Sequence, residues 1–365
     1  MAEARARSWA RLLRPDSAFG RLVARLSEPG GYFDTDNLIS NERSYLHVVG
    51  ALRRLGVRGG AYIGVGPDQN FSYLAAVRPD VAFIVDLRRD NLLEQLMFKA
   101  LFAASRSRME YLCLWVGRRC PEDLAGWESG GIEELVEYLD GVPEDPAAAA
   151  AAREAVLSRV GRFGIPLSEE DRATVARFHD AFIGQGLDLR FASHGRAPRF
   201  YYPTLRQLLL ERDLEGRPAG YLGAEQAFRF VKRMSDENRI VPVVGDLADR
   251  HALAQIGRLL AERGEMVSAF YTSNVEFYLV RQGSFDAFVQ NLAGLPHDAR
   301  SVIIRSYFGG AFGRPHPAQR PGYASAQLLQ GIERLEEAYG RGEIRGYYGL
   351  VTHDAVPLAP AAGGR

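Results

Sequence analysis

Residues 58–90 read RGGAYIGVGPDQNFSYLAAVRPDVAFIVDLRRD and predict a strand, a helix and a second strand in succession. An apolar strand at 61–63 runs into the glycine-rich turn GVG, and a helix is expected at 67–77. The apolar run 81–85 forms the second strand, which closes on Asp86. A βαβ unit with glycines after its first strand and an acid after its second is typical of a nucleotide or nucleoside cofactor site.

Strands and helices alternate again after residue 238, which predicts an α/β fold with a doubly wound, mostly parallel sheet. Further strands are expected at 239–244, 265–270, 299–307 and 344–351, with a helix at 326–339 before the last of them. A helix is also expected from about residue 36 to residue 55, starting at Asp36 or Asn37.

These elements divide the chain into an interrupted core and three additions. The predicted units are an N-terminal helical segment covering the sheet (1–57), a Rossmann-like core (58–116 and 238–352), a helical insertion (117–237) and a disordered tail (353–365). An all-helical insertion of this size usually covers a pocket or forms an interface. Within it, residues 190–203 form a loop rich in arginine and aromatic residues.

Composition excludes several classes of function. Forty-five basic and 45 acidic residues give a formal net charge of zero, so no overall positive charge favours nucleic acid or an anionic membrane. No apolar run has the roughly 18 residues of a spanning helix. Two cysteines, Cys113 and Cys120, are too few for a disulfide framework, and no two histidines have metal-ligand spacing. These features predict a cytoplasmic protein without a metal site, and they do not indicate an oligomeric state.

Polar residues follow four of the predicted strands, where the carboxyl ends of a parallel sheet place ligands. Glycines let a ligand approach the backbone, and an acid such as Asp86 can accept from ribose hydroxyls. Asp68 puts a negative charge at a helix start, which disfavours a pyrophosphate and tolerates an ammonium group. The predicted cofactor-binding residues are Gly64, Gly66, Asp68, Asn70, Asp86, Arg88, Asp246 and Leu247.

Other uses of these residues remain open. The glycines can form a tight turn that binds no ligand, and Asp86 can cap the helix that follows it. Asp246 can equally be an N-cap, and Arg88 can lie in a solvated turn. After the fourth core strand, Tyr271, Asn274 and Glu276 are the predicted catalytic residues, because a carboxylate or amide there can orient an acceptor or take its proton.

The set Gly64 and Gly66, Asp86, and Gly245-Asp246-Leu247 resembles the class I S-adenosylmethionine-dependent methyltransferases. Those proteins have a glycine-rich turn, a ribose-binding acid and often Gly-Asp-Ala at the ends of their first three strands. Ser273 to Phe277 occupies the place of their polar-Pro-Pro-aromatic stretch without its prolines, and the third glycine of the first motif is absent. The chain also resembles an uncharacterised bacterial family with such a core, which implies a fold and no reaction.

This resemblance implies a methyltransferase-like Rossmann fold and S-adenosylmethionine as cofactor, with a small molecule or a protein side chain as methyl acceptor. Two alternatives stay open. One is an NAD-dependent oxidoreductase, which should show the tighter G-x-G-x-x-G spacing. The other is a catalytically inactive, methyltransferase-like binding protein whose own side chains, such as Tyr62, Gln69 or Phe71, fill the cofactor space.

Overall fold

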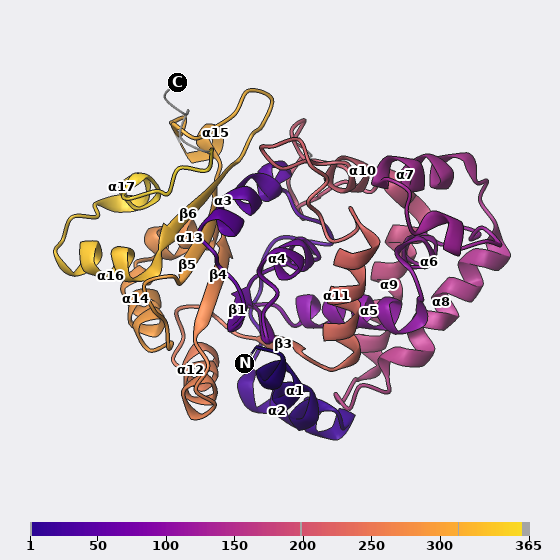
Figure 1. The fold of residues 1–365 in the computed structure, drawn as a ribbon, viewed down its shortest axis with the longest axis horizontal. Helices are drawn as coiled ribbons and strands as arrows, with labels where there is room; N and C mark the ends of the chain where they lie inside the picture. The colour runs from indigo at the N-terminus through magenta and orange to yellow at the C-terminus, as the bar shows by residue number, and fades with distance from the viewer. Residues whose placement is uncertain (1, 198, 313, 360–365) are drawn as a thin grey trace.

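A computed structural model describes residues 2–197, 199–312 and 314–359, and a six-stranded sheet lies at its centre (Figure 1). The strand order is β3-β2-β1-β4-β5-β6, and every neighbouring pair is parallel except β5 and β6. The strands are β1 (Ala61–Gly64), β2 (Val81–Asp86), β3 (Ile240–Val244), β4 (Val267–Ser273), β5 (Val302–Tyr307) and β6 (Ala326–Gly331). The prediction of an α/β fold with a mostly parallel sheet is confirmed.

The order of the strands fixes where a ligand can reach the sheet. The chain moves outward from β1 to β3 on one side and from β4 to β6 on the other, so the order reverses between β1 and β4. In an open α/β sheet, the crevice outside the carboxyl ends of the strands at this reversal is the usual ligand site.

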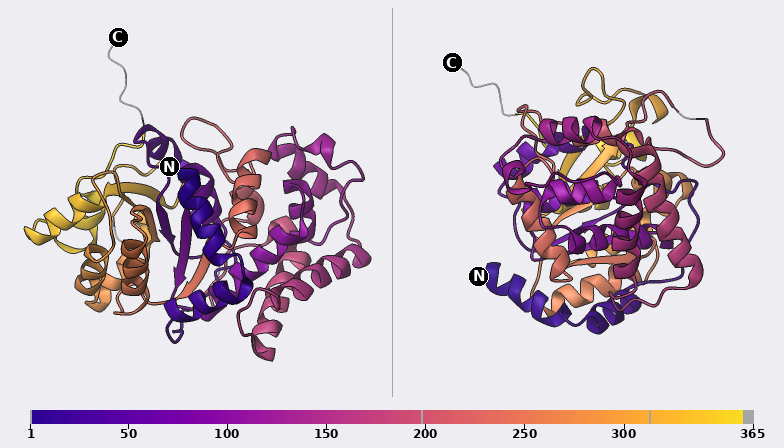
Figure 2. Two further views of the ribbon diagram at one scale, coloured as in Figure 1. Left: turned by 60° about the horizontal axis from the view of Figure 1, so that its bottom comes forward. Right: turned by 90° about the vertical axis from the view of Figure 1, so that its right-hand side faces the viewer.

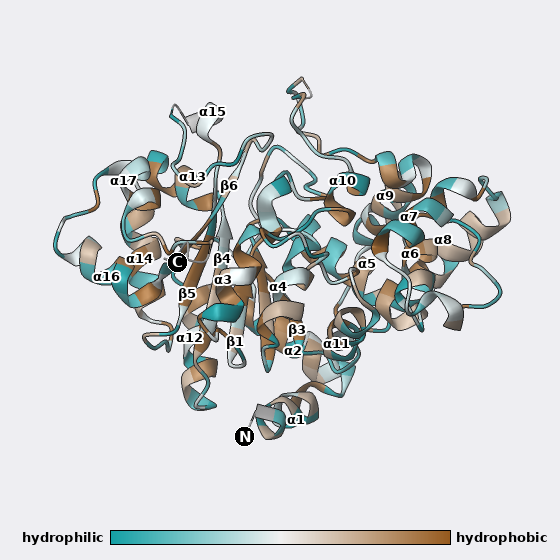
Figure 3. Ribbon diagram, turned by 45° about the horizontal axis from the view of Figure 1, so that its top comes forward, coloured by the Kyte–Doolittle hydropathy of each residue, from teal (hydrophilic) through white to brown (hydrophobic). Residues whose placement is uncertain are grey.

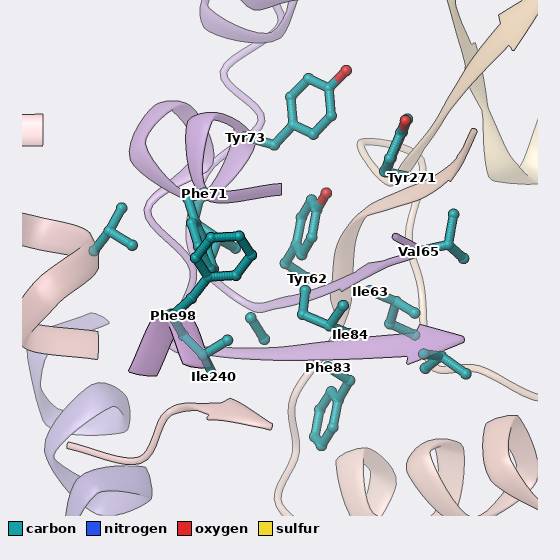
Figure 4. Packing of buried hydrophobic residues seen from close by; sticks show 14 of the residues in the cluster. Tyr62, Ile63, Val65, Phe71, Tyr73, Phe83, Ile84, Phe98, Ile240 and Tyr271 are labelled. Carbon is teal, nitrogen blue, oxygen red and sulfur yellow. The ribbon is translucent and has the colours of Figure 1, made fainter. Parts of the chain in front are cut away.

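Both faces of the sheet are covered by helices, which is why its strands are apolar almost throughout (Figure 3). Tyr271 of β4 packs against Tyr73 of α4, whereas its neighbour Phe270 packs against Phe288 of α14. Successive strand residues point to opposite faces, so α4 and α14 lie on different sides of the sheet. Figure 4 shows Tyr62, Tyr73 and Tyr271 together on the α4 side and Phe83 on the other.

The helices that cover the sheet come from every part of the chain. They are α1 (Ala2–Leu13), α2 (Asp16–Leu26), α3 (Val49–Arg54), α4 (Gln69–Val77), α5 (Arg89–Ala104), α11 (Glu225–Asp236), α12 (Ala252–Glu262), α13 (Val275–Gln282), α14 (Phe285–Ala293), α15 (Gly309–Phe312), α16 (Ile332–Gly340) and α17 (Gly346–Thr352).

A group of helices extends the molecule away from the sheet beyond α5 (Figures 1 and 2). It consists of α6 (Arg108–Trp115), α7 (Ile132–Gly141), α8 (Pro146–Val160), α9 (Glu169–Gln185) and α10 (Leu205–Leu209). Ser168 begins α9 with a capping box to Asp171. The centre of the Trp115 ring lies 5.5 Å from that of Phe98 and 5.1 Å from that of Phe182. The apolar core therefore continues from α5 into this group. The division into separate units stays a prediction.

The helix expected at 36–55 is mostly wrong. Residues 27–42 form a loop, followed by a 3-10 helix, η1 (Arg43–Val48), and only then by α3. Asn37 has a φ of +56°, which an α-helix does not allow. The loop crosses to distant partners instead: the Thr35 hydroxyl donates to the Ala192 carbonyl, and the Glu28 amide donates to the Val244 carbonyl.

Two elements near the C-terminus are also wrong. The helix expected at 326–339 begins as β6, which pairs along its whole length with β5, and becomes helical only at α16. The strand expected at 344–351 is helix α17. In this helix Tyr347 packs against Tyr307 and donates to the Ser306 carbonyl. Tertiary pairing therefore overrides local propensity in both places.

Of the tail expected to be disordered, residues 360–365 lie outside the described residues. Residues 353–359 contact the fold, since the Val356 amide donates to the Leu329 carbonyl over 2.7 Å. Within the described ranges, no helix is both long enough and apolar enough to cross a bilayer.

A glycine in the N-terminal helix α2 and a second in α9 differ in how closely other residues approach them. A Cβ on Gly20 of α2 would lie 1.8 Å from the Gly164 carbonyl oxygen, whereas a Cβ on Gly184 of α9 would meet nothing within 4 Å. We expect Gly20→Ala to lower the free energy of unfolding by about 1–3 kcal/mol through overpacking. Gly184→Ala should raise it by up to about 1 kcal/mol. Urea unfolding measures both, and equal effects would contradict the close approach of α2 to Gly164.

Candidate functional site

A cavity of about 390 Å³ opens at the carboxyl ends of β1, β2, β3 and β4. Its lining combines the ends of these strands with the N-terminal loop and with the 190–203 loop of the helical insertion. Six of the predicted site residues line it, namely Gly66, Asp86, Arg88, Asp246, Leu247 and Asn274. The crevice expected from strand order is therefore a real cavity, of a size usual for small-molecule sites.

The glycine turn after β1 is held from beneath by Asn70. The buried Asn70 side chain donates to the carbonyls of Val65 and Pro67 at 2.9 and 2.8 Å and accepts from the Tyr62 hydroxyl at 2.8 Å. A Cβ on Gly64 would lie 2.0 Å from Asn70 Oδ1, so only glycine allows this contact. Asn70 and Gly64 lie outside the cavity lining and shape the turn that presents Gly66, whose φ is +81°.

Asp86, at the end of β2, is paired with Arg88. The Arg88 guanidinium donates through Nε to Oδ1 (3.1 Å) and through Nη2 to Oδ2 (3.2 Å), and the Arg88 amide also donates to Oδ1. Arg88 Nη1 reaches the carbonyls of Thr35 and Asp36 at 2.7 and 2.8 Å. Arg88 thus ties the N-terminal loop to the strand end and leaves Asp86 only part of its acceptor capacity.

Asp246, at the end of β3, forms the next part of the wall. Its Oδ1 accepts from the Ala248 amide at 2.9 Å, and its own amide donates to Glu28 Oε1 at 2.5 Å. This contact caps a turn, because α12 begins only at Ala252. Its other carboxylate oxygen, Oδ2, has no hydrogen bond within the described part of the chain and is available to a donor.

Glu42 is a cavity residue that the predicted set omitted. Its carboxylate accepts from the Tyr271 hydroxyl at 2.5 Å and from the Ser273 hydroxyl. Burial raises the pKa of Glu42, and these hydrogen bonds oppose the rise. Tyr271 itself is fully buried outside the lining and also accepts from Gln69 Nε2 at 3.1 Å, so it reaches the cavity only through Glu42 and Gln69.

The predicted catalytic residue Glu276 points away from the cavity. It forms a buried, bidentate pair with Arg305 of β5, with N···O distances of 2.6 and 3.0 Å. Arg305 also donates to Gln330 of β6 at 2.5 Å. Both oxygens of Glu276 are used by one guanidinium, so its placement fits a structural role between α13 and the sheet.

Asp68 also lies outside this cavity. It is buried beside Tyr221, whose hydroxyl lies 3.4 Å from Asp68 Oδ2, and it borders a separate small pocket. Burial raises the pKa of Asp68 to about 7. Its carboxyl therefore does not meet a ligand that binds against Gly66.

The 190–203 loop supplies a wall that the predicted site did not include. Its contribution consists of Phe191, Ser193, Arg196, Arg199, Tyr201 and Tyr202. The loop is fixed to the N-terminal loop, since the His194 amide donates to the Asp34 carbonyl and Arg196 pairs with Asp34 at 2.8 Å. Its arginine and aromatic composition was the sequence signal for this wall, but nothing in the sequence placed it over the sheet.

A family model described as a domain of unknown function, DUF7790, matches residues 38–125 and 193–341, more than half of the chain. The chain belongs to this family. The DUF7790 match contains all the strands and most of the cavity lining, but it leaves out residues 126–192, where α7, α8 and α9 lie. A comparison with curated proteins finds no match. Across the described residues, no group of three or more His, Cys, Asp or Glu side chains is placed to hold a metal ion.

The Glu276–Arg305 pair gives a prediction about stability. Glu276→Gln leaves the buried Arg305 charge unpaired, so the free energy of unfolding should fall by about 3–5 kcal/mol. Glu276→Gln combined with Arg305→Met should recover part of that loss. Asp180→Asn breaks the half-exposed Arg153–Asp180 pair and should change little. Urea unfolding decides, and a stable Glu276→Gln protein would contradict the structural role.

Asp68 gives a pH-dependent prediction. Its folded pKa of about 7 lies above the ordinary value, so the native state holds a proton that the unfolded state releases. Stability from this group is present below the ordinary carboxyl pKa and is lost as the pH rises towards 7. Asp68→Asn removes this loss. The free energy of unfolding of the variant minus that of wild type should therefore be about 2–3 kcal/mol higher at pH 8 than at pH 5. Asp90→Asn, in the first turn of α5, is the control, and a difference independent of pH would contradict the burial of an ionisable Asp68.

Proposed function

We propose that this DUF7790 protein is an S-adenosylmethionine-dependent methyltransferase that acts on a small molecule. The observation that carries the proposal is that Gly66, Asp86 and Asp246 line one cavity together with Asn274. They follow β1, β2, β3 and β4, which is the order of the corresponding segments in the methyltransferases that the sequence resembles. A protein side chain remains an alternative acceptor.

Several features of the cavity fit this cofactor. Gly66 has no side chain, and a Cβ there would lie 3.2 Å from Asn37 Nδ2 and 3.4 Å from Gln69 Nε2. The side-chain oxygen Oε1 of Gln69 is buried and has no hydrogen-bond partner among the described residues, so it can accept from an ammonium group. Asp86 would accept from ribose hydroxyls with its remaining capacity, and Asp246 from an amino group of the base.

The cofactor, when bound, supplies an electrophilic methyl group on a sulfonium. The protein then has to hold an acceptor in line and take the proton that the acceptor loses. Glu42 is suited to that proton, because its raised pKa makes it a stronger base than an exposed carboxylate. The Tyr271 and Ser273 hydroxyls fix its position, and the Asn274 side chain lies next to Ser273 in the cavity wall.

Two features bear on the alternatives. Tyr62 and Phe71 pack in the core instead of filling the cavity, while Gln69 forms part of its wall, so the space expected to be plugged in an inactive binding protein is open. The turn after Gly66 leads into Pro67-Asp68-Gln69 without the third glycine of a dinucleotide site. The first feature disfavours the inactive binding protein, and the second disfavours the NAD-dependent oxidoreductase.

Isothermal titration with S-adenosylmethionine and S-adenosylhomocysteine tests the proposal. Wild type should bind both, and Asp86→Asn and Asp246→Asn should each weaken binding about tenfold, since each removes a charged hydrogen-bond acceptor. Asp180→Asn, far from the cavity, is the control. Absence of binding by wild type, or unchanged affinity in both cavity variants, would overturn the proposal, and tighter binding of NAD would support the oxidoreductase instead.

A further inference from the structure

The cavity has two arginines without a carboxylate partner. Of its four arginines, Arg88 pairs with Asp86 and Arg196 pairs with Asp34. Arg199 and Arg281 form no ion pair with any described residue. Arg199 Nη1 donates to the Tyr201 hydroxyl at 2.5 Å. The Arg281 guanidinium lies 5.4 Å from the centre of the Phe277 ring.

Arg196 and Arg199 lie near Tyr278 of α13. Burial raises the pKa of Tyr278, and the positive charges of Arg196 and Arg199 oppose that rise, which places both near its hydroxyl. Arg281 follows Tyr278 by three residues in α13 and therefore lies on the same side of this helix, one turn further along. The end of the cavity next to α13 and the 190–203 loop is therefore positively charged.

The acids of the cavity do not neutralise this end. Asp86 is already paired with Arg88, and the Glu42 carboxylate accepts from the hydroxyls of Tyr271 and Ser273 and forms no ion pair with a described arginine. Asp246 lies on the opposite side of the sheet order, after β3, and forms no ion pair with a described arginine. Arg199 and Arg281 are both exposed to solvent and form no ion pair with a described residue, so an anionic ligand in the cavity can pair with them.

Aromatic rings also line the cavity. The lining contains Tyr32, Phe33, Phe191, Tyr201, Tyr202, Phe277, Tyr278 and Phe308. Phe33 and Tyr278 meet edge to face at 5.2 Å, and Tyr201 and Tyr202 do so at 5.2 Å. Such rings can stack on, or meet edge to face, the flat ring of an aromatic ligand.

We propose that this end of the cavity binds a small aromatic acid, with its carboxylate or phosphate held by Arg199 and Arg281 and its ring against the tyrosines of the 190–203 loop. The assignment of this acid as methyl acceptor rests on the proposed function. Binding of the acid does not, because Arg199 and Arg281 are separate from Gly66, Asp86 and Asp246.

Titration with benzoate, phenyl phosphate and neutral benzamide tests this inference on the full chain. Both anions should bind wild type, the better of them identifying the anionic group, and benzamide should bind at least tenfold more weakly. Arg199→Gln and Arg281→Gln should each weaken the anion about tenfold and leave benzamide unchanged. Arg258→Gln replaces an exposed arginine of α12 that forms no ion pair with the described residues and lies outside the cavity lining, so it should behave as wild type.

The outcomes separate the two proposals. Equal binding of benzamide and the anions, no anion binding, or unchanged affinity in both cavity arginine variants would overturn the inference. Anion binding that depends on Arg199 and Arg281 in a protein that binds no S-adenosylhomocysteine would support the inference and overturn the methyltransferase. S-adenosylhomocysteine affinity should be unchanged in both arginine variants, and a parallel loss would show that these arginines serve the cofactor instead of an acceptor.

Discussion

The Arg88 guanidinium joins the two parts of the chain that make the cavity. It holds both oxygens of Asp86 at the end of β2 and the carbonyls of Thr35 and Asp36 in the N-terminal loop. It acts together with the backbone hydrogen bonds from Glu28 to Val244 and from Gly31 to Leu87, which also keep that loop over the carboxyl ends of the strands. The same pairing removes most of the negative charge of Asp86, so a ligand there meets a hydrogen-bond acceptor more than an anion.

The parallel core of the fold could be predicted from the sequence because its strands are short apolar runs, and the first three end in, or run directly into, glycine or acid. Residues 58–90 contain β1, α4 and β2 almost as expected. The errors lie where a segment depends on a distant partner. The run Ala326–Gly331 has a helical apolar stripe, but β5 offers it an open edge, and pairing with that edge determines its conformation.

The residues of the candidate site also divide into those that the sequence could place and those that depend on distant partners. Gly66, Asp86 and Asp246 could be placed together because parallel strands bring their carboxyl ends to one edge. Glu276 could not be assigned correctly from its position after β4 alone. The arginine within the otherwise apolar strand VIIRSY was the missed signal, since a buried Arg305 requires a carboxylate nearby. The partners of Glu42 could not be predicted, because Tyr271 and Ser273 are more than 200 residues away in the sequence.

Two cavity residues with left-handed backbone show how these contacts shape the site. Asn37 has a φ of +56° and Ser273 a φ of +54°, although neither is glycine. Such a conformation costs about 1 kcal/mol or more and persists where surrounding contacts enforce it. At Ser273 the pairing of β4 with β5 shifts register, and the turned residue donates its hydroxyl to Glu42. The irregular end of β4 thus positions the buried Glu42 carboxyl in the cavity wall. In a regular strand, the Ser273 side chain would point in another direction.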